Sequence, residues 1–239
     1  MQRINSYLVS CGLAPSRRKA EELIKNGLVS VNGKVVTNLA TQISDTDRVI
    51  CEGTSAKKEK EVYLILNKPK GYICTKTDPQ KRRTIFDLIG GGYRNYTLHS
   101  VGRLDYDTSG IIILTNDGNF TQAASHPSKN IVKSYIADID KPVSASDIRK
   151  LKNGINIDGK VAIAKMQSLS SGEFNRVKMD IVEGRYHIVK RILNELGYEV
   201  NALKREKFGK LSAKDIHTGK YKEISKKEAY AGLGVEIDQ

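Results

Sequence analysis

The chain has 239 residues, and its 40 Lys and Arg against 27 Asp and Glu give a formal net charge of +13. A hydrophobic content of 39% excludes a chain that is disordered throughout, and the length accommodates two domains. The positive charge favours nucleic acid as a partner, whereas the sequence contains neither an apolar run of membrane-spanning length nor a basic amphipathic helix with bulky apolar anchors.

The three cysteines, Cys11, Cys51 and Cys74, are widely spaced and form no CxxC pair. They therefore indicate neither a disulfide framework nor a metal centre. The first residues of the chain also lack the apolar core of a signal peptide. We expect a cytoplasmic protein with reduced, bystander thiols and no membrane association.

The chain opens with two helical patterns. Apolar side chains from Ile4 to Cys11 recur at helical spacing, which predicts one amphipathic helix. Ser16 can cap a second helix, and Asn26-Gly27 is typical of a helix end. The exposed side of this second helix is predicted to be strongly basic.

A β-hairpin and a linker are predicted next. The Asn32-Gly33 pair separates two alternating segments, residues 29–31 and 34–36, which is a strong signal for a tight hairpin. Residues 52–61 are polar, charged and almost without apolar side chains, so they predict a flexible linker. A small N-terminal unit is therefore expected to precede a larger one.

These N-terminal patterns together resemble an S4 RNA-binding domain. The resemblance implies that the basic second helix faces RNA, although such a charge run can also be a solvated helix face. The segments that carry the resemblance are Arg3-Ile4-Asn5-x-Tyr7-Leu8, Ser16-Arg17-Arg18-x-Ala20-x-x-Leu23-Ile24 and Gly27-x-Val29-x-Val31-Asn32-Gly33. The RNA contacts that it implies are Arg3, Arg17, Arg18 and Lys19.

The remainder of the chain shows mixed helical and extended patterns, with strands dominant. The continuous apolar run at residues 111–114 predicts a strand buried on both faces. Further strands are predicted at residues 63–66, 133–139 and 176–182, and helices at residues 146–151 and 186–196. This order of elements predicts a mixed α+β domain.

Four segments of the large unit carry residues suited to chemistry. Each has an ordinary structural explanation when taken alone: a strand-exit turn, a loop before a core strand, a core tyrosine or a structural histidine. The segments are Leu66-Asn67-Lys68-Pro69-Lys70-Gly71-Tyr72, Gly102-Arg103-Leu104-Asp105, Lys133-Ser134-Tyr135 and Glu183-Gly184-Arg185-Tyr186-His187-Ile188-Val189-Lys190-Arg191.

The spacing of Asp105 and Asp107 matches the start of a calcium-binding loop. The twelfth position of such a loop would be Asn116 rather than a bidentate Glu, and aliphatic residues fill the intervening positions. We therefore expect no metal site. The Asp117-Gly118 pair that follows is predicted to form a turn.

In their order and residue sequence, the four segments resemble motifs of the pseudouridine synthases that carry an N-terminal S4 domain and act on ribosomal RNA. The resemblance implies that Asp105 is the catalytic nucleophile and that Tyr135 stacks on the target uracil. It also implies that Arg185 pairs with the catalytic Asp. Ile188 departs from the pattern, because relatives usually have Gln at that position.

The resemblance further implies an α+β fold in which an S4-type domain precedes a catalytic domain with a mainly antiparallel sheet. The expected boundaries are residues 1–51, the linker 52–61 and residues 62–239. No cofactor is expected, since the isomerisation neither adds nor removes atoms and has no redox step. Further RNA contacts are expected at Lys68, Lys70, Arg103, His187, Lys190 and Arg191.

The expected partner is ribosomal RNA or a ribosomal particle, bound by a monomer. The sequence Arg185-Tyr186-His187 favours small-subunit over large-subunit RNA as the substrate. Two alternatives remain open at this point: an enzyme of the large-subunit RNA, and a ribosome-assembly protein that binds RNA without catalysis.

Overall fold

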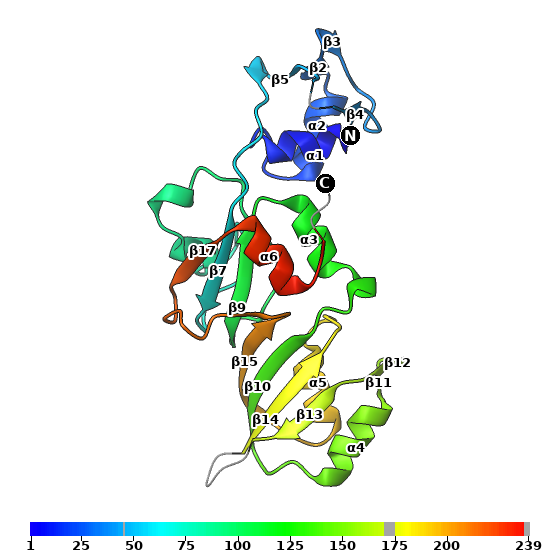
Figure 1. Cartoon of the computed structure of the whole chain (residues 1–239), viewed down its shortest axis with the longest axis vertical. Helices are drawn as coiled ribbons and strands as arrows, with labels where there is room; N and C mark the ends of the chain where they lie inside the picture. The colour runs from blue at the N-terminus through cyan, green and yellow to red at the C-terminus, as the bar shows by residue number, and fades with distance from the viewer. Residues whose placement is uncertain (45, 170–174, 237–239) are drawn as a thin grey trace.

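The computed structural model describes residues 1–44, 46–169 and 175–236. The molecule is elongated, with the small N-terminal unit at one end and the large sheet extending away from it (Figure 1). Among the described residues, no helix has both the length and the apolar character needed to cross a membrane.

Both helices of the small unit lie where the sequence predicts them. Helix α1 (Ile4–Ser10) is followed by α2 (Arg17–Lys25), and the Ser16 hydroxyl caps α2 by accepting a hydrogen bond from the Lys19 N–H at 3.2 Å. The apolar faces of the two helices are buried against each other and against the small sheet, with Ile4 fully buried.

The predicted hairpin is also confirmed. Its strands are β2 (Val29–Val31) and β3 (Lys34–Val35), and the turn residues Asn32 and Gly33 have φ angles of 51° and 80°. Such angles are those of the tight turns that match strand twist. The sheet continues in the order β3-β2-β5-β6, and a separate strand pair packs beside the helices. The remaining strands of this unit are β1 (Gln2–Arg3), β4 (Gln42–Ile43), β5 (Val49–Cys51) and β6 (Thr54–Ser55).

The segment predicted as a linker is hydrogen-bonded to both units. Its first half contains β6, and its second half contains Glu59, whose N–H donates to the carbonyl of Ser10 at 2.9 Å. The Glu59 carboxylate accepts bonds from the N–H and the hydroxyl of Thr97, at 3.0 and 3.1 Å, and from the Asn116 amide at 3.1 Å. These bonds tie the end of α1 to the large unit.

A mainly antiparallel sheet organises the large unit, as the sequence predicts. Its path is β13-β14-β10-β15-β9-β7-β17, and only the β15–β9 contact on this path is parallel. The strands are β7 (Tyr63–Lys68), β8 (His99–Val101), β9 (Thr108–Thr115), β10 (Lys133–Ile139), β13 (Lys165–Ser168), β14 (Arg176–Ile181), β15 (Val200–Phe208), β16 (Leu211–Ser212) and β17 (Tyr221–Ile224), with β11 (Ile155–Ile157) and β12 (Lys160–Ala162) as a separate hairpin.

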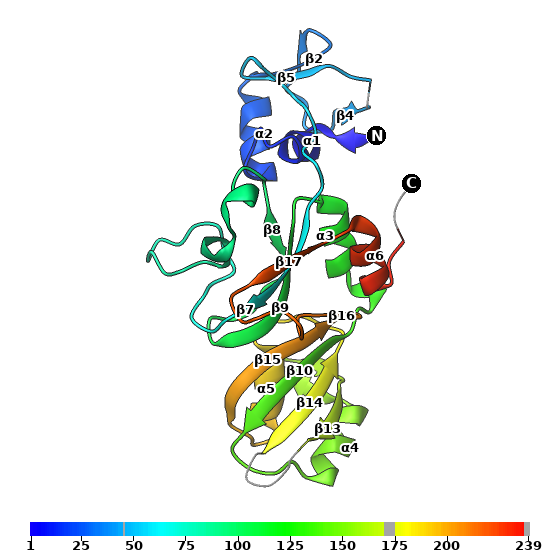
Figure 2. The same cartoon turned by 60° about the vertical axis from the view of Figure 1, so that its left-hand side comes forward.

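Helices pack at both ends of this sheet, as the two views show (Figures 1 and 2). Near the small unit, α3 (Gly118–Ser125) and α6 (Lys226–Leu233) cover β7 and β9. At the far end, α4 (Ala145–Asn153) and α5 (Ile188–Glu195) cover β10, β13 and β14. The apolar run of β9 is buried on both faces, which confirms its prediction as a central strand.

The β15–β9 contact positions the site. Arg205 of β15 lies opposite Gly110 of β9, and a side chain on Gly110 would collide with the Arg205 carbonyl. Glycine at this position therefore allows the close approach of the two strands. The Asp105 loop enters the sheet immediately before this contact.

Two local predictions are wrong. Asp117 does not form a turn with Gly118; it caps α3, because its Oδ1 accepts the N–H groups of Asn119 and Phe120 at 2.9 and 3.0 Å. The helix predicted from residue 186 begins at Ile188, because His187 adopts a left-handed conformation with φ of 50°.

Candidate active site

A pocket of about 500 Å³ opens where β9 and β15 run parallel. Its walls are the loop that follows β8, the start of β10, the junction between β14 and α5, and part of β15. Asp105, Tyr135 and Arg185, the three predicted catalytic residues, all line it. The three residues that the resemblance implies therefore lie in one pocket, although the contacts within it differ from those expected.

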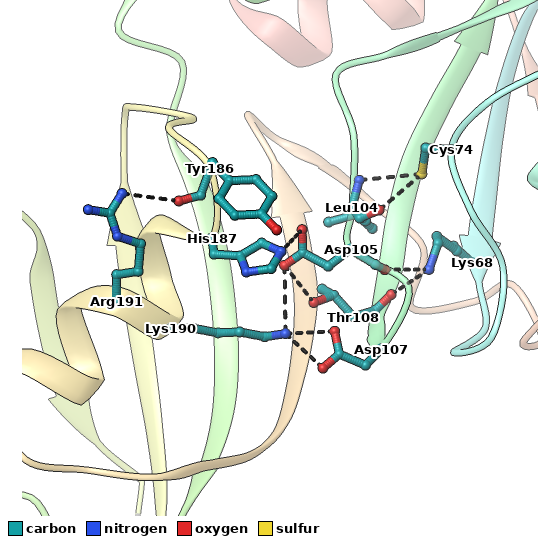
Figure 3. A network of polar contacts seen from close by, with 10 residues as sticks. All are labelled: Lys68, Cys74, Leu104, Asp105, Asp107, Thr108, Tyr186, His187, Lys190 and Arg191. Atoms are coloured by element: carbon teal, nitrogen blue, oxygen red, sulfur yellow. Dashed lines mark hydrogen bonds and ion pairs between the residues drawn. The ribbon is translucent and has the colours of Figure 1, made fainter.

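Lys68 fixes the loop that carries Asp105. Its side chain is fully buried, and Nζ donates to the carbonyl oxygens of Asp105 and Thr108 at 2.8 and 2.7 Å (Figure 3). Nζ also donates to the Pro69 carbonyl at 3.2 Å. Burial lowers the pKa of Lys68. The prediction that Lys68 contacts RNA is wrong, because its ammonium group is enclosed by the protein and bonded to the backbone.

A cysteine holds the same loop from the other side. The Cys74 thiol donates to the Leu104 carbonyl at 3.3 Å, and its sulfur accepts the Leu104 N–H at 3.4 Å (Figure 3). Burial raises the pKa of this thiol, so it stays neutral and can donate. Cys74 is therefore a contact of the site rather than the bystander that its spacing suggested.

Two basic side chains from α5 and its cap face the Asp105 carboxylate (Figure 3). His187 Nε2 lies 3.2 Å from Oδ1, and Lys190 Nζ lies 3.7 Å from Oδ2. The Thr108 hydroxyl donates to Oδ2 at 3.5 Å. The ring of Tyr186 stacks on that of His187, with centroids 3.7 Å apart. These contacts hold the carboxylate at the wall of the pocket, where it can act as a nucleophile.

Lys190 connects the two carboxylates of the loop. Its Nζ donates to both carboxylate oxygens of Asp107, at 2.6 and 2.8 Å, while it faces Asp105. This hydrogen bond lowers the pKa of Asp107. Lys190 was expected to guide phosphates; in the structure it joins α5 to the Asp105 loop.

Arg185 does not form the predicted pair with Asp105. Its guanidinium forms two bonds to the Glu183 carboxylate, one of them at 2.9 Å, and donates to the Ile157 carbonyl at 2.9 Å. The hydrogen bond to Glu183 raises the pKa of Arg185. The left-handed turn at His187 separates Arg185 from the helix, so the residues of the first helical turn reach Asp105 instead. The expected arginine–aspartate pair is therefore corrected to contacts from His187 and Lys190.

Tyr135 lies in the wall of the pocket, on β10. It is partly buried and pairs across the sheet with Arg205 of β15. Ile188, where relatives were expected to have Gln, is almost fully buried in the apolar core beside α5. The substitution therefore extends the core at the edge of the pocket.

The other predicted RNA contacts lie in three kinds of environment. Arg191 forms an ion pair with Asp158, while His187 and Lys190 face the Asp105 loop. The remaining side chains are exposed, as contact with phosphates requires: Arg3, Arg17, Arg18, Lys19, Lys70 and Arg103.

Comparison with known proteins agrees with this arrangement. The model of the family described as RNA pseudouridylate synthase matches residues 62–195, and that of the S4 domain matches residues 2–49. A ribosomal large subunit pseudouridine synthase B of Bacillus subtilis is 38% identical over 234 residues, covering 95% of this chain and 94% of the relative. A ribosomal small subunit pseudouridine synthase A of Pasteurella multocida is 33% identical, covering 95% and 97%.

The fold has a solved counterpart of nearly the same extent. A crystal structure of a pseudouridylate synthase superposes with a TM-score of 0.70 at 30% identity, covering 98% of this chain and all of the other. The family model spans the β7 strand, the Asp105 loop, Tyr135 and the start of α5, which together build the pocket. The chain belongs to the RNA pseudouridine synthase family and carries an N-terminal S4 domain.

Proposed function

We propose that this protein converts a uridine of ribosomal RNA to pseudouridine in the pocket around Asp105. The observation that carries the proposal is the Asp105 carboxylate, which lines the pocket while His187 and Lys190 face its two oxygens. Two relatives that cover 95% of the chain are named as pseudouridine synthases of the large and small ribosomal subunits, which supports ribosomal RNA as the substrate.

The reaction breaks the C1′–N1 bond of uridine, turns the uracil ring and joins C5 to C1′. Asp105 supplies the anionic oxygen that the reaction needs, and the contacts from His187 and Lys190 direct it. Tyr135 offers a ring on which the detached uracil stacks, worth about 1–3 kcal/mol. The base must leave its helix to enter the pocket, so the substrate is a single-stranded or locally opened segment.

Arg185 takes a different place in this proposal from the one predicted. Glu183 already neutralises its guanidinium, which also bonds the Ile157 carbonyl of β11. Arg185 then shapes the wall of the pocket and holds the β11–β12 hairpin against it. Arg185 therefore contributes to catalysis by positioning that wall of the pocket.

The exposed basic residues of both units would bind the RNA backbone. In the small unit they lie on α2 and at β1, and in the large unit they are Lys70 and Arg103. Phosphate contacts of this kind give affinity that falls as salt rises. The S4 domain would then hold the RNA while the target base enters the pocket.

Two ribosomal RNAs are candidate substrates. The wording Arg185-Tyr186-His187 predicts small-subunit RNA, whereas the higher identity belongs to a relative named for the large subunit. Mapping pseudouridine on both RNAs of cells that lack the gene would test the proposal. One site should lose its modification and regain it with the wild-type gene, but not with Asp105→Asn. Unchanged modification at every site would favour the assembly-protein alternative.

A further inference from the structure

Arg205 has no role in the mechanism given above, yet the residue lines the pocket. The side chain is 2% exposed and lines the same cavity as Asp105 and Tyr135. Its Nη2 is buried and has no hydrogen-bond partner within residues 1–44, 46–169 and 175–236. A buried donor without a partner costs about 1–3 kcal/mol, and more when it is charged.

The sheet pairs Arg205 with Tyr135, and both residues line the pocket. Arg205 is the cross-strand neighbour of Tyr135 on one side and of Gly110 on the other. Directly opposed residues of an antiparallel pair project from the same face, so Arg205 and Tyr135 share the face that lines the pocket. Gly110 has no side chain, which lets β9 approach the backbone of Arg205 closely.

Only part of the guanidinium is used by the fold. Nε donates to the Ile111 carbonyl at 2.9 Å, and Cζ lies 5.1 Å from the centre of the Phe208 ring. These contacts fix the plane of the group and leave Nη2 free among the described residues. A neutral donor would satisfy Ile111 equally well, so structural support alone does not explain a buried charge at this position.

The surrounding charges also favour an anionic ligand. Buried Lys68 lies close enough to Arg205 for their charges to repel. Lys133, which lines the pocket, is also close enough to Arg205 to be repelled by its charge. Burial, and then the charge of Arg205, lower the pKa of Lys133. The cost of holding these cations together is offset when negative charge enters the pocket.

We propose that Arg205 is a further catalytic residue, whose free Nη2 donates a hydrogen bond to a carbonyl oxygen of the target uracil. As the Asp105 carboxylate bonds to C1′, the C1′–N1 bond breaks, and both of its electrons leave with the uracil and spread over N1 and the ring carbonyls. The guanidinium stabilises this anion while the ring turns. C5 then bonds to C1′ while the bond between C1′ and Asp105 breaks, which restores the carboxylate. C5 loses its proton and N1 gains one, so atoms and electrons balance.

Arg205→Met tests the inference, with Lys204→Met as a matched control on the exposed, opposite side of the same strand. Methionine keeps the apolar stem and removes the buried charge. The Tm should change by no more than about 4 °C, since the lost Ile111 bond is offset by relief of the buried charge. Single-turnover pseudouridine formation should fall about 10- to 100-fold, while RNA affinity, set by phosphates, stays within about twofold.

A second variant and modified substrates separate binding of the base from support of the fold. Arg205→Lys keeps the charge and can reach the Ile111 carbonyl but lacks the second donor nitrogen of the guanidinium. The variant should therefore fold and yet react more slowly. RNA with 2-thiouridine or 4-thiouridine at the target carries a weaker acceptor at one carbonyl. One of these substrates should slow the wild type but cause no added loss in the Arg205 variants.

Three results would overturn the inference: a folded Arg205→Met that reacts at the wild-type rate, a loss of rate that follows a large fall in Tm, and additive losses with both thio-substrates. The inference rests on the proposed function of the pocket. If the wild-type chain formed no pseudouridine, the proposed function would fail and this inference with it. An active wild type beside an equally active Arg205→Met would overturn the inference alone.

Discussion

Lys68→Met removes the ammonium group that holds the Asp105 loop and keeps the apolar stem of the side chain. The carbonyl oxygens of Asp105 and Thr108, now 2.8 and 2.7 Å from Nζ, lose a charged donor. Hydrogen bonds to charged groups contribute about 1.5–3 kcal/mol each, and relief of the buried charge returns part of that sum. We expect a net loss of about 2–4 kcal/mol, which lowers the Tm by about 4–16 °C.

Activity should fall further than stability alone explains. With its loop released, Asp105 no longer faces His187 and Lys190 in a fixed position, and a displacement of about 1 Å can cost about 100-fold in rate. The assays are thermal unfolding and single-turnover pseudouridine formation below the Tm of the variant. RNA affinity should stay unchanged, because the ammonium group is buried.

Lys70→Met is the matched control, since Lys70 follows Lys68 by two positions and is exposed. It should leave the Tm unchanged and weaken RNA binding, with a smaller salt dependence. If Lys68→Met instead had the wild-type Tm and bound RNA less tightly, Lys68 would not hold the Asp105 loop, and the predicted phosphate contact would be restored.

Three further substitutions test other contacts. Lys190→Met should lower the rate of pseudouridine formation about 10-fold or more by releasing Asp105, whereas Arg185→Met should lower it less. If single-turnover assays gave the opposite order, the predicted pair between Arg185 and Asp105 would be restored. Asp107→Asn should lower the free energy of unfolding above pH about 3.8, because the folded protein lowers the pKa of Asp107. The difference from wild type should vanish as the pH falls through that folded pKa. Urea titrations in which the difference persists at lower pH would contradict this. Glu59→Ala should broaden the distance distribution between spin labels on the two units, and an unchanged distribution would show that Glu59 does not fix their arrangement.

Local patterns in the sequence predicted the small unit well. A helix face, a serine cap and an Asn-Gly turn are decided by residues within a few positions of one another, so α1, α2 and the β2–β3 hairpin lie where expected. The continuous apolar run of β9 likewise identified a strand with both faces covered. The location of the pocket followed from resemblance, and the structure gathers all three predicted catalytic residues there.

The contacts inside the pocket were harder to predict, because they depend on side-chain direction. Lys68 was assigned to the surface as part of a basic turn, yet it continues the inward-facing row of Leu64 and Leu66 at the spacing of a strand. That alternation was the available signal. Lys190 follows His187 by three positions, the spacing of one helix face, which could have indicated that both reach the same carboxylate.

Other contacts had no local signal. The left-handed residue that starts α5 is a histidine, so neither glycine nor asparagine indicated that the helix begins late and separates Arg185 from Asp105. Arg205 resembles any basic residue of an alternating strand. Its place in the pocket depends on the pairing of β15 with both β10 and β9, which no local pattern shows.

The most direct measurement is the release of tritium from ribosomal RNA labelled at uracil C5, with wild-type protein and Asp105→Asn compared at equal RNA occupancy. The C5 hydrogen leaves when C5 joins C1′, so release reports the isomerisation itself. The structure predicts that the neutral amide keeps the fold and RNA affinity and lowers release by at least about 10³-fold. Release at the wild-type rate from the Asp105→Asn protein would contradict a reaction centred on this carboxylate.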